Sequence, residues 1–209
     1  SLTGRLTSAY VYSEINRIRE NIVGTLEKEK KKTVVFTAPH DDAGTTFLLT
    51  IIAFNVAYFT SLKTLLVDLN MRRPQLHVPF GLKREGGFTE IAAGTLKWAE
   101  AVKDTGLAEL KVVTAGLADN ELHLTLTSEL VENMINEMKE DFDLIMFDSS
   151  PLLNKNKNNV DPVLLSRACE MVVMVVQDKM TTKAVLVEAV DTIKDGGGEI
   201  YGIVYNKQF

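Results

Sequence analysis

Thr37-Ala38-Pro39-His40-Asp41-Asp42-Ala43-Gly44-Thr45-Thr46 is the stretch that decides how this chain of 209 residues should fold. It follows the β-rich run Thr33-Val34-Val35-Phe36 and precedes an apolar run with helical character at 47–59. A loop between a strand and a helix N-terminus is a common phosphate site, because backbone N–H groups converge there and the helix dipole favours an anion. The position of this stretch therefore predicts a phosphate-binding loop.

The loop keeps two features of such a site and lacks its main positive charge. Gly44 and the hydroxyl of Thr46 are present, but Thr45 stands where a phosphate-binding lysine is expected. Asp41 and Asp42 add negative charges, and one like-charge contact at about 4–6 Å costs roughly 2–4 kcal/mol at an effective dielectric near 20. We therefore expect nucleotide binding to be weak or lost. In the alternative, both aspartates point into solvent, which still leaves the lysine missing.

The composition is that of an ordinary globular protein. The net charge of −5 gives no basic surface for nucleic acid, so no nucleic-acid partner is expected. Cys169 is the one cysteine, which excludes an internal disulfide and fits a reducing compartment, and its apolar neighbours predict burial. The apolar run 47–59 is too short to span a membrane and contains Thr50 and Asn55, so it is expected to be a buried helix.

Apolar residues alternate between helix and strand patterns along the chain. An amphipathic helix is expected first, with an apolar stripe of Tyr12, Ile15, Ile18, Ile22 and Leu26. Strands are expected at 33–37, 64–68, 110–114, 144–148, 171–177 and 200–205, mostly as continuous apolar runs. Such runs are typical of a parallel sheet that is buried on both faces.

Further helices are expected between these strands. One carries a stripe of Leu126, Leu130, Met134 and Met138; another covers 185–193, with Thr181 or Thr182 as cap and 196–198 as the stop. The pattern predicts an α/β fold, doubly wound, with a mostly parallel sheet and helices on both faces in three layers. We expect one domain over 1–209, with an N-terminal amphipathic helix region at 1–31 and an α/β core at 32–209.

Two acidic segments follow predicted strands. Asp68 is followed by Leu69-Asn70-Met71-Arg72-Arg73-Pro74, and Asp148 is followed by Ser149-Ser150-Pro151. The carboxyl ends of parallel strands meet at one edge of a sheet, so both aspartates should lie near the phosphate loop. A carboxylate there can hold a magnesium-bound water or polarise a nucleophile, which makes Asp68 and Asp148 the candidate catalytic residues.

Taken in order, these motifs resemble the cytoplasmic domain of bacterial tyrosine kinases (BY-kinases) of capsule and exopolysaccharide systems. This family lies in the deviant-Walker P-loop group with the MinD and ParA ATPases. The segment 68–74 is similar to the family's D-x-D-x-R-[KR]-P motif, and 87–94 to its G-L-x-x-x-L-x-G segment. Likewise, 143–151 is similar to its Walker B, Asp161-Pro162 to the following D-A, and 202–206 to the closing G-x-V-x-N.

The resemblance implies a P-loop NTPase-like fold and roles for individual residues. It implies nucleotide binding by Gly44, Thr45, Thr46, Arg72 and Asn206, and Mg²⁺ binding by Thr46, Asp68 and Asp148. Glu14, Arg17 and Arg19 are similar to the family's E-x-x-R-x-x-R oligomer-contact motif, although the second arginine comes one residue early. An ordinary charged helix face would explain these three residues as well.

The departures from the family pattern concentrate at the chemistry. Thr45 replaces the lysine, Asp42 replaces a loop glycine, and Asn70 replaces the second aspartate of its motif. Asparagine cannot act as a general base at neutral pH. Relative to the family pattern, the asparagine- and lysine-rich run 154–159 looks like an insertion after the Walker B segment, close to where nucleotide would lie.

The two ends of the chain also differ from the family pattern. The family's C-terminal tyrosine cluster is absent, since only Tyr201 and Tyr205 precede the end at Phe209. The chain opens on Ser1, which is compatible with a piece cut from something longer, and truncation would explain the missing tyrosine cluster.

These residues predict a degenerate member of the family, a pseudokinase, with no firm cofactor and only weakened binding of ATP or ADP with Mg²⁺. The resemblance implies a cytoplasmic regulator or scaffold in exopolysaccharide or capsule polymerisation and export. Its partner would be a transmembrane polysaccharide co-polymerase adaptor or an active BY-kinase, and it could form a homo-oligomer. It would lie at the inner face of the cell membrane, through a partner or a missing membrane segment.

Three alternatives remain open. The first is an active ATP-dependent tyrosine autokinase whose charge comes from Arg72, Arg73 or a neighbouring subunit. The second is a MinD- or ParA-like positioning ATPase, against which the Arg72-Arg73-Pro74 segment, followed by His77 and Phe80, argues. The third is a cation site formed by His40, Asp41, Asp42, Asp68 and Asp148.

Overall fold

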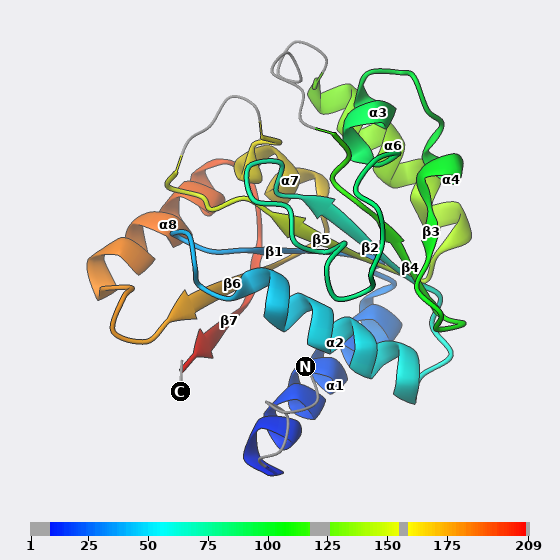
Figure 1. Ribbon diagram of the computed structural model, residues 1–209. Coiled ribbons are helices and arrows are strands. Elements are labelled where there is room, and N and C mark those ends of the chain that lie inside the picture. Colours follow the sequence, from blue (N-terminus) through cyan, green and yellow to red (C-terminus); the bar gives the residue numbers. More distant parts are fainter. Residues whose placement is uncertain (1–8, 118–125, 155–158, 208–209) are drawn as a thin grey trace.

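The computed structural model describes residues 9–117, 126–154 and 159–207 (Figure 1). Within these residues, one seven-stranded sheet has the strand order β3-β4-β2-β5-β1-β6-β7. All neighbouring strands are parallel except β3, which runs antiparallel to β4 at one edge. The strands are β1 (Thr33–Thr37), β2 (Thr64–Leu69), β3 (Lys103–Asp104), β4 (Leu110–Val113), β5 (Leu144–Ser149), β6 (Met171–Gln177) and β7 (Ile200–Asn206).

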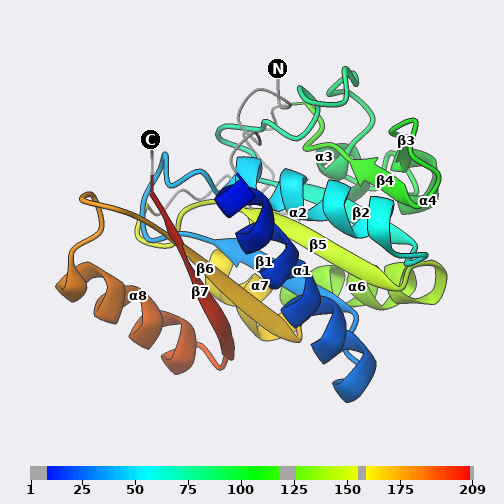
Figure 2. The same ribbon diagram turned by 90° about the horizontal axis from the view of Figure 1, so that it is seen from below.

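Helices cover both faces of the sheet, as Figure 2 shows for α2 and α6 on opposite sides of β2 and β5. Two apolar clusters separate the faces: one joins the sheet to α1 and α2, the other to α3, α4, α6, α7 and α8. The predicted doubly wound α/β fold is therefore confirmed. The helices are α1 (Ala9–Glu29), α2 (Thr45–Phe59), α3 (Phe88–Ala92), α4 (Trp98–Ala101), α6 (Ser128–Asp141), α7 (Pro162–Ala168) and α8 (Lys183–Asp195).

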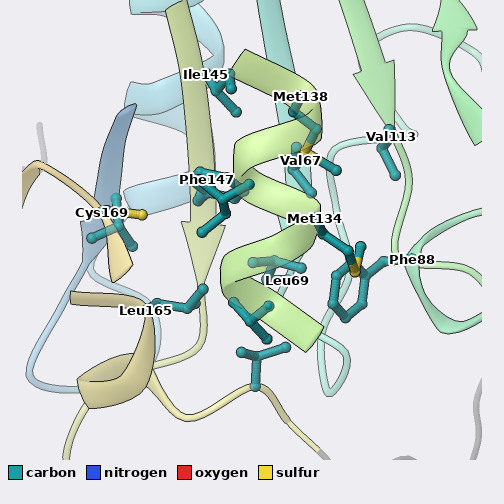
Figure 3. Close-up of a cluster of buried hydrophobic side chains, with 14 of the residues drawn as sticks. Val67, Leu69, Phe88, Val113, Met134, Met138, Ile145, Phe147, Leu165 and Cys169 are labelled. Carbon is teal, nitrogen blue, oxygen red and sulfur yellow. The ribbon is translucent and has the colours of Figure 1, made fainter. Parts of the chain in front are cut away.

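The four central strands β1, β2, β5 and β6 are buried along their whole length, which explains their continuous apolar sequences. On the face covered by α6, Met134 and Met138 point toward the strands and pack with Ile145 and Phe147 (Figure 3). Cys169 is buried in the same cluster, as the sequence predicted. This packing fixes the position of the strands, and the candidate site lies at their carboxyl ends.

The helix α6 begins later than its apolar stripe suggested. Thr127 is its N-cap, because the Thr127 hydroxyl accepts a hydrogen bond from the Leu130 backbone N–H. Leu126 therefore precedes the helix instead of belonging to it, although it still packs on the core. In α8 the predicted cap is confirmed at Thr182, whose hydroxyl accepts from the Val185 N–H.

The buried helix α2 accommodates its polar residues through hydrogen bonds. The Thr50 hydroxyl donates to the Thr46 carbonyl at 2.7 Å, and the Asn55 carbonyl accepts from Arg19 of α1 at 2.9 Å. The stripe on α1 is only partly core: Ile15, Ile22 and Leu26 are buried, whereas Tyr12 is 44% exposed. Tyr12 packs edge-on against Phe59 of α2 at a ring separation of 6.4 Å.

The sequence pattern missed α7, and it also missed three very short elements: α3 with five residues, α4 with four and β3 with two. Elements as short as these three contain no full hydrophobic period, so only tertiary contacts define them. No helix of the described ranges is long and apolar enough to cross a membrane.

Two glycines give a matched test of packing against helix propensity. A Cβ on Gly87 would lie 2.2 Å from the Thr114 carbonyl oxygen and 2.4 Å from the Gly116 nitrogen, whereas one on Gly24 meets nothing within 4 Å. We expect Gly87→Ala to lower the free energy of unfolding by about 1–3 kcal/mol, because backbone must shift. Gly24→Ala, at an exposed position in α1, should raise it by about 0.5–1 kcal/mol. Urea denaturation measures both, and equal stability of the two variants would contradict the tight packing of Gly87.

Candidate phosphate-binding site

The candidate site lies at the carboxyl ends of β1, β2 and β5. The strand β5 pairs with β1 on one side and with β2 on the other, and its Asp148 lies in register with Asp68 of β2. Consecutive strands β1 and β2 are therefore separated by β5, which creates the crevice where α/β sheets bind ligands. The loop after β1 runs along this crevice into α2.

The loop keeps the backbone shape that glycines normally provide. Gly44 is the N-cap of α2 with φ 80°, and its carbonyl accepts the first helical hydrogen bond from Leu48 at 2.9 Å. Asp42, where the family has glycine, also has a positive φ of 63°. Aspartate is among the few residues with a side chain that adopt this region, at some energetic cost. The backbone at Asp42 therefore has the conformation that a glycine would adopt at this position of the loop.

Asp148 is fully buried beneath the loop. Its Oδ2 accepts a hydrogen bond from the Thr46 hydroxyl at 2.5 Å, whereas its Oδ1 has no partner within the described residues. Burial raises the pKa of Asp148 well above its ordinary value, and the neighbouring Asp68 carboxylate raises that pKa further. The hydrogen bond from Thr46 acts in the opposite direction. The side chains of Thr46 and Asp148 are therefore brought together, as the resemblance predicted.

Asp68 organises the segment that follows β2. Its Oδ1 accepts from the Asn70 N–H, and its Oδ2 accepts from the N–H groups of Gln75 and Leu76, all at 3.1 Å. Burial nevertheless raises the pKa of Asp68 to about 7, although these backbone hydrogen bonds lower it. The candidate catalytic carboxylate is thus also the anchor of the turn at 70–76.

The oxygen atoms at this edge fit a magnesium ion by their chemistry. Mg²⁺ prefers hard oxygen ligands, and the free Oδ1 of Asp148 lies in a buried position next to the Thr46 hydroxyl and Asp68. Such an ion would supply positive charge beside the loop. Binding by Thr46, Asp68 and Asp148 stays a prediction.

Asp41 and Asp42 are each paired with an arginine, which neither sequence-based alternative supposed. The Asp41 carboxylate lies 3.1 Å from the Arg72 guanidinium and also accepts from Asn154 at 2.6 Å. The Asp42 carboxylate pairs with Arg73 at 3.1 Å. Asp41, at 18% exposure, therefore does not point into solvent as the alternative supposed, whereas the Asp42 side chain is 78% exposed and does, although it is paired. The two arginines next to the site neutralise both charges.

Asn206, at the end of β7, lies against the loop. Its side-chain amide donates to the Ala43 carbonyl at 2.8 Å, and a Cβ on Gly44 would lie 2.5 Å from the same nitrogen. A side chain at position 44 would therefore have to displace the Asn206 amide, and it would also be strained by the left-handed backbone at φ 80°. Asn70 accepts a hydrogen bond from the Arg73 N–H at 3.2 Å, so its side chain supports the turn.

A cavity of about 610 Å³ opens beside the loop. Thr45 lines it in place of a lysine, so its only side-chain cation among the described lining residues is Arg73. Sequence reasoning missed Gln75, Val78 and Pro79 in the wall of this cavity, because their residue types do not mark them as site residues. The cavity is lined by Ala38, His40, Asp41, Asp42, Ala43, Gly44, Thr45, Thr46, Phe47, Thr50, Asn70, Arg73, Gln75, Val78, Pro79, Ser149 and Pro151.

The proposed five-residue cation site does not form. Among the residues that the structure describes, no three His, Cys, Asp or Glu side chains are grouped to hold a metal ion. The reason is that Asp41 and Asp42 are directed to Arg72 and Arg73, whereas Asp68 and Asp148 lie buried below the loop. His40 lines the cavity instead of joining them.

The three residues of the oligomer-contact motif lie on α1. Arg17 pairs with Glu14 at 2.5 Å on the exposed side of the helix. Arg19 is only 12% exposed: it donates to Asn55, pairs with Glu20 and lies 4.9 Å from the ring centre of Phe59. Arg19 is thus engaged within the chain, which leaves Glu14 and Arg17 as the accessible pair. Their role in oligomer contact stays a prediction.

The run 154–159 lies partly outside the described residues, which end at Asn154 and resume at Asn159. Its two flanking asparagines reach the site from one loop. Asn154 donates to Asp41, and the Asn159 carbonyl accepts from the Arg72 N–H at 3.0 Å. The sequence suggested the location of this run but gave no sign of these contacts.

The buried carboxylates predict an unusual pH dependence of stability. The pKa of Asp68 is higher in the folded chain, about 7, than its ordinary 3.8, so folding binds a proton between these values. Its contribution is complete below about pH 4 and is lost as the pH rises through 7. We expect Asp148→Asn, which removes the facing carboxylate, to stabilise the fold at pH 8 by about 1–3 kcal/mol and to flatten this slope.

Thermal unfolding between pH 4 and pH 8, in buffer with a metal chelator, measures this effect. Asp191→Asn on the exposed side of α8 is the control for a simple change of charge. An Asp148→Asn variant with the slope of the unmodified chain would show that the carboxylate pair does not govern the pH dependence.

Comparison with known proteins agrees with the geometry. No protein-family model matches the chain. It is similar to the putative tyrosine-protein kinase CapB of Staphylococcus aureus, at 26% identity over 91% of this chain and 81% of that protein. The tyrosine-protein kinase CpsD of Streptococcus agalactiae is 26% identical over 92% of this chain and 81% of that protein. The tyrosine-protein kinase ptk of Acinetobacter johnsonii matches over 92% of this chain but only 26% of its own length.

Solved structures share the fold. The chimerical protein CapA2B2 superposes with a TM-score of 0.84 at 22% identity, covering 97% of this chain and 86% of that one. The kinase domain of Escherichia coli tyrosine kinase ETK gives 0.84 at 19% identity, covering 92% and 74%. MinD of Pyrococcus horikoshii gives 0.70 at 16% identity, covering 84% and 70%. The chain therefore has the fold of these tyrosine kinase domains and of MinD, and its sequence is similar to those of the tyrosine-protein kinases named above.

Proposed function

We propose that this chain is a degenerate BY-kinase-like domain, a pseudokinase, that acts as a cytoplasmic regulator or scaffold in exopolysaccharide or capsule polymerisation and export. The observation that carries the proposal is the charge balance of the loop. Thr45 supplies no cation, and the nearest arginines, Arg72 and Arg73, are each paired with an aspartate of the same loop. A polyphosphate would meet no unpaired side-chain cation among the described residues of this wall.

Phosphoryl transfer depends almost entirely on positioned charge and on orientation of the nucleophile. Asn70 cannot take a proton from a tyrosine hydroxyl at neutral pH, and its carbonyl oxygen is already used by the Arg73 N–H. The loss of the cation and of the base at one site supports a binding role over a catalytic one.

The system and the partner follow from the family resemblance. A transmembrane co-polymerase adaptor or an active BY-kinase would hold the domain at the inner face of the membrane. The retained fold supports such a role, because a docking surface needs the packed sheet and helices but not the phosphate loop. Self-association through Glu14 and Arg17 is compatible with this role, since both side chains are accessible on α1.

Incubation with labelled ATP and magnesium tests the proposal directly. We expect no tyrosine phosphorylation above the level of an Asp148→Asn variant, because neither the lysine charge nor a base is present. Phosphotyrosine on the unmodified chain would replace the pseudokinase proposal with the autokinase alternative. Nucleotide-dependent dimerisation without phosphotyrosine would instead favour a positioning ATPase.

A gain-of-function variant separates the loop from the rest of the pocket. Thr45→Lys with Asp42→Gly restores the missing charge and removes one negative charge, so we expect ATP affinity to rise at least about tenfold. Calorimetry or a fluorescent nucleotide would measure it. The control is Ser61→Lys with Asp195→Gly, which changes the net charge equally at exposed positions. An equal gain in this control would show that long-range charge, not the loop, limits binding.

A further inference from the structure

Three loops meet at one pair of charges beside the cavity. The Asp41 carboxylate from the loop after β1 pairs with Arg72 from the loop after β2 at 3.1 Å. Both partners are held from the loop after β5: Asn154 donates to Asp41 at 2.6 Å, and the Asn159 carbonyl accepts from the Arg72 N–H at 3.0 Å. Asp41 is only 18% exposed, so this pair is partly shielded from water.

A second pair lies beside the first. Asp42 contacts Arg73 through both carboxylate oxygens, at 3.1 and 3.3 Å from the same guanidinium nitrogen. Two consecutive acidic residues thus meet two consecutive arginines across the end of β5. Asp42 makes this contact from a left-handed backbone conformation, which favours glycine. The residue that forms the ion pair with Arg73 is therefore also the one whose backbone conformation is energetically unfavourable.

A carboxylate is the side chain that most resembles a phosphate oxygen pair to an arginine, because the guanidinium fork binds both anions in the same geometry. From this arrangement we infer that Asp41 and Asp42 act as an intramolecular anion. They hold Arg72 beside the cavity and Arg73 in its wall, so that neither guanidinium is available to a polyphosphate. This autoinhibitory latch rests on the proposed function, since it names the device that regulates the same site.

The latch has a direct consequence for ligand binding. A polyphosphate that uses the arginines must first displace the two carboxylates, so the apparent affinity is lowered by competition within the chain. Removing the carboxylates should free the arginines without adding any new cation. That effect is distinct from the missing lysine, which lowers affinity whether or not the latch is closed.

Calorimetric titration with inorganic tripolyphosphate, in buffer without magnesium, tests the latch. In Asp41→Asn with Asp42→Asn, we expect the affinity to rise at least about tenfold, because the arginines lose their internal partners. Asparagine keeps the shape of aspartate and tolerates the left-handed conformation at position 42. The matched control is Asp191→Asn with Asp195→Asn on α8, which changes the net charge by the same amount at exposed positions.

A third variant tests whether the gain in tripolyphosphate affinity depends on the two arginines. Adding Arg72→Gln and Arg73→Gln to the double variant should return tripolyphosphate affinity to the level of the unmodified chain or below. Circular dichroism confirms that each variant is folded. If the double variant does not fold, Asp42→Gly takes its place, since glycine adopts the left-handed conformation without strain; it should raise affinity about threefold or more through Arg73 alone.

Equal gains in the double variant and the α8 control would overturn the latch, and so would a gain that survives loss of both arginines. Neither result bears on the pseudokinase proposal, which depends on phosphotyrosine formation by the unmodified chain with ATP and magnesium. Conversely, an active unmodified chain would end the pseudokinase proposal while leaving the tripolyphosphate comparison valid.

Discussion

The register of β2 against β5 places two buried aspartates side by side at the carboxyl ends of these strands. The site depends on that constraint. Asp68 and Asp148 are buried neighbours on parallel strands, and each is connected to a different segment. Asp68 holds the turn after β2 through three backbone N–H groups, whereas Asp148 holds the start of α2 through Thr46. The loops that surround the cavity are therefore fastened to one pair of carboxylates, which burial drives toward the protonated state.

The sequence was sufficient to predict the fold because its signals are long and redundant. Continuous apolar runs marked the parallel strands, and the bounds of β1 and β6 agree with the predicted ranges. The short elements α3, α4 and β3 carry no period that a sequence could reveal. Leu126 was assigned to a helix because it continues an apolar stripe, but the hydroxyl of Thr127 caps the N-terminus of α6, so the helix begins at Ser128. Local capping chemistry decided that boundary against the periodic pattern.

The site was predictable in its position but not in its electrostatics. That Asp68, Asp148 and the loop would converge followed from the shared carboxyl edge of a parallel sheet. The pairing of Asp41 with Arg72 and of Asp42 with Arg73 could not be deduced, because β5 lies between β1 and β2 in the sheet. Nothing in the sequence states that side chains reach across the end of that strand. Asn154 and Asn159 were equally hidden, since their contacts depend on where one loop folds back.

Asp148 is compatible with magnesium binding, yet its contacts also give it a structural role. It is fully buried, and through its hydrogen bond with Thr46 it fixes the first turn of α2, a helix with no side-chain cap of its own. A carboxylate with that structural role would remain in a chain that performs no phosphoryl transfer. The lysine position has no such role, because a side chain there would extend into the cavity that Thr45 now lines. A pattern in which the buried carboxylates stay and the cavity-facing cation disappears is therefore the one expected when the fold is needed and the reaction is not.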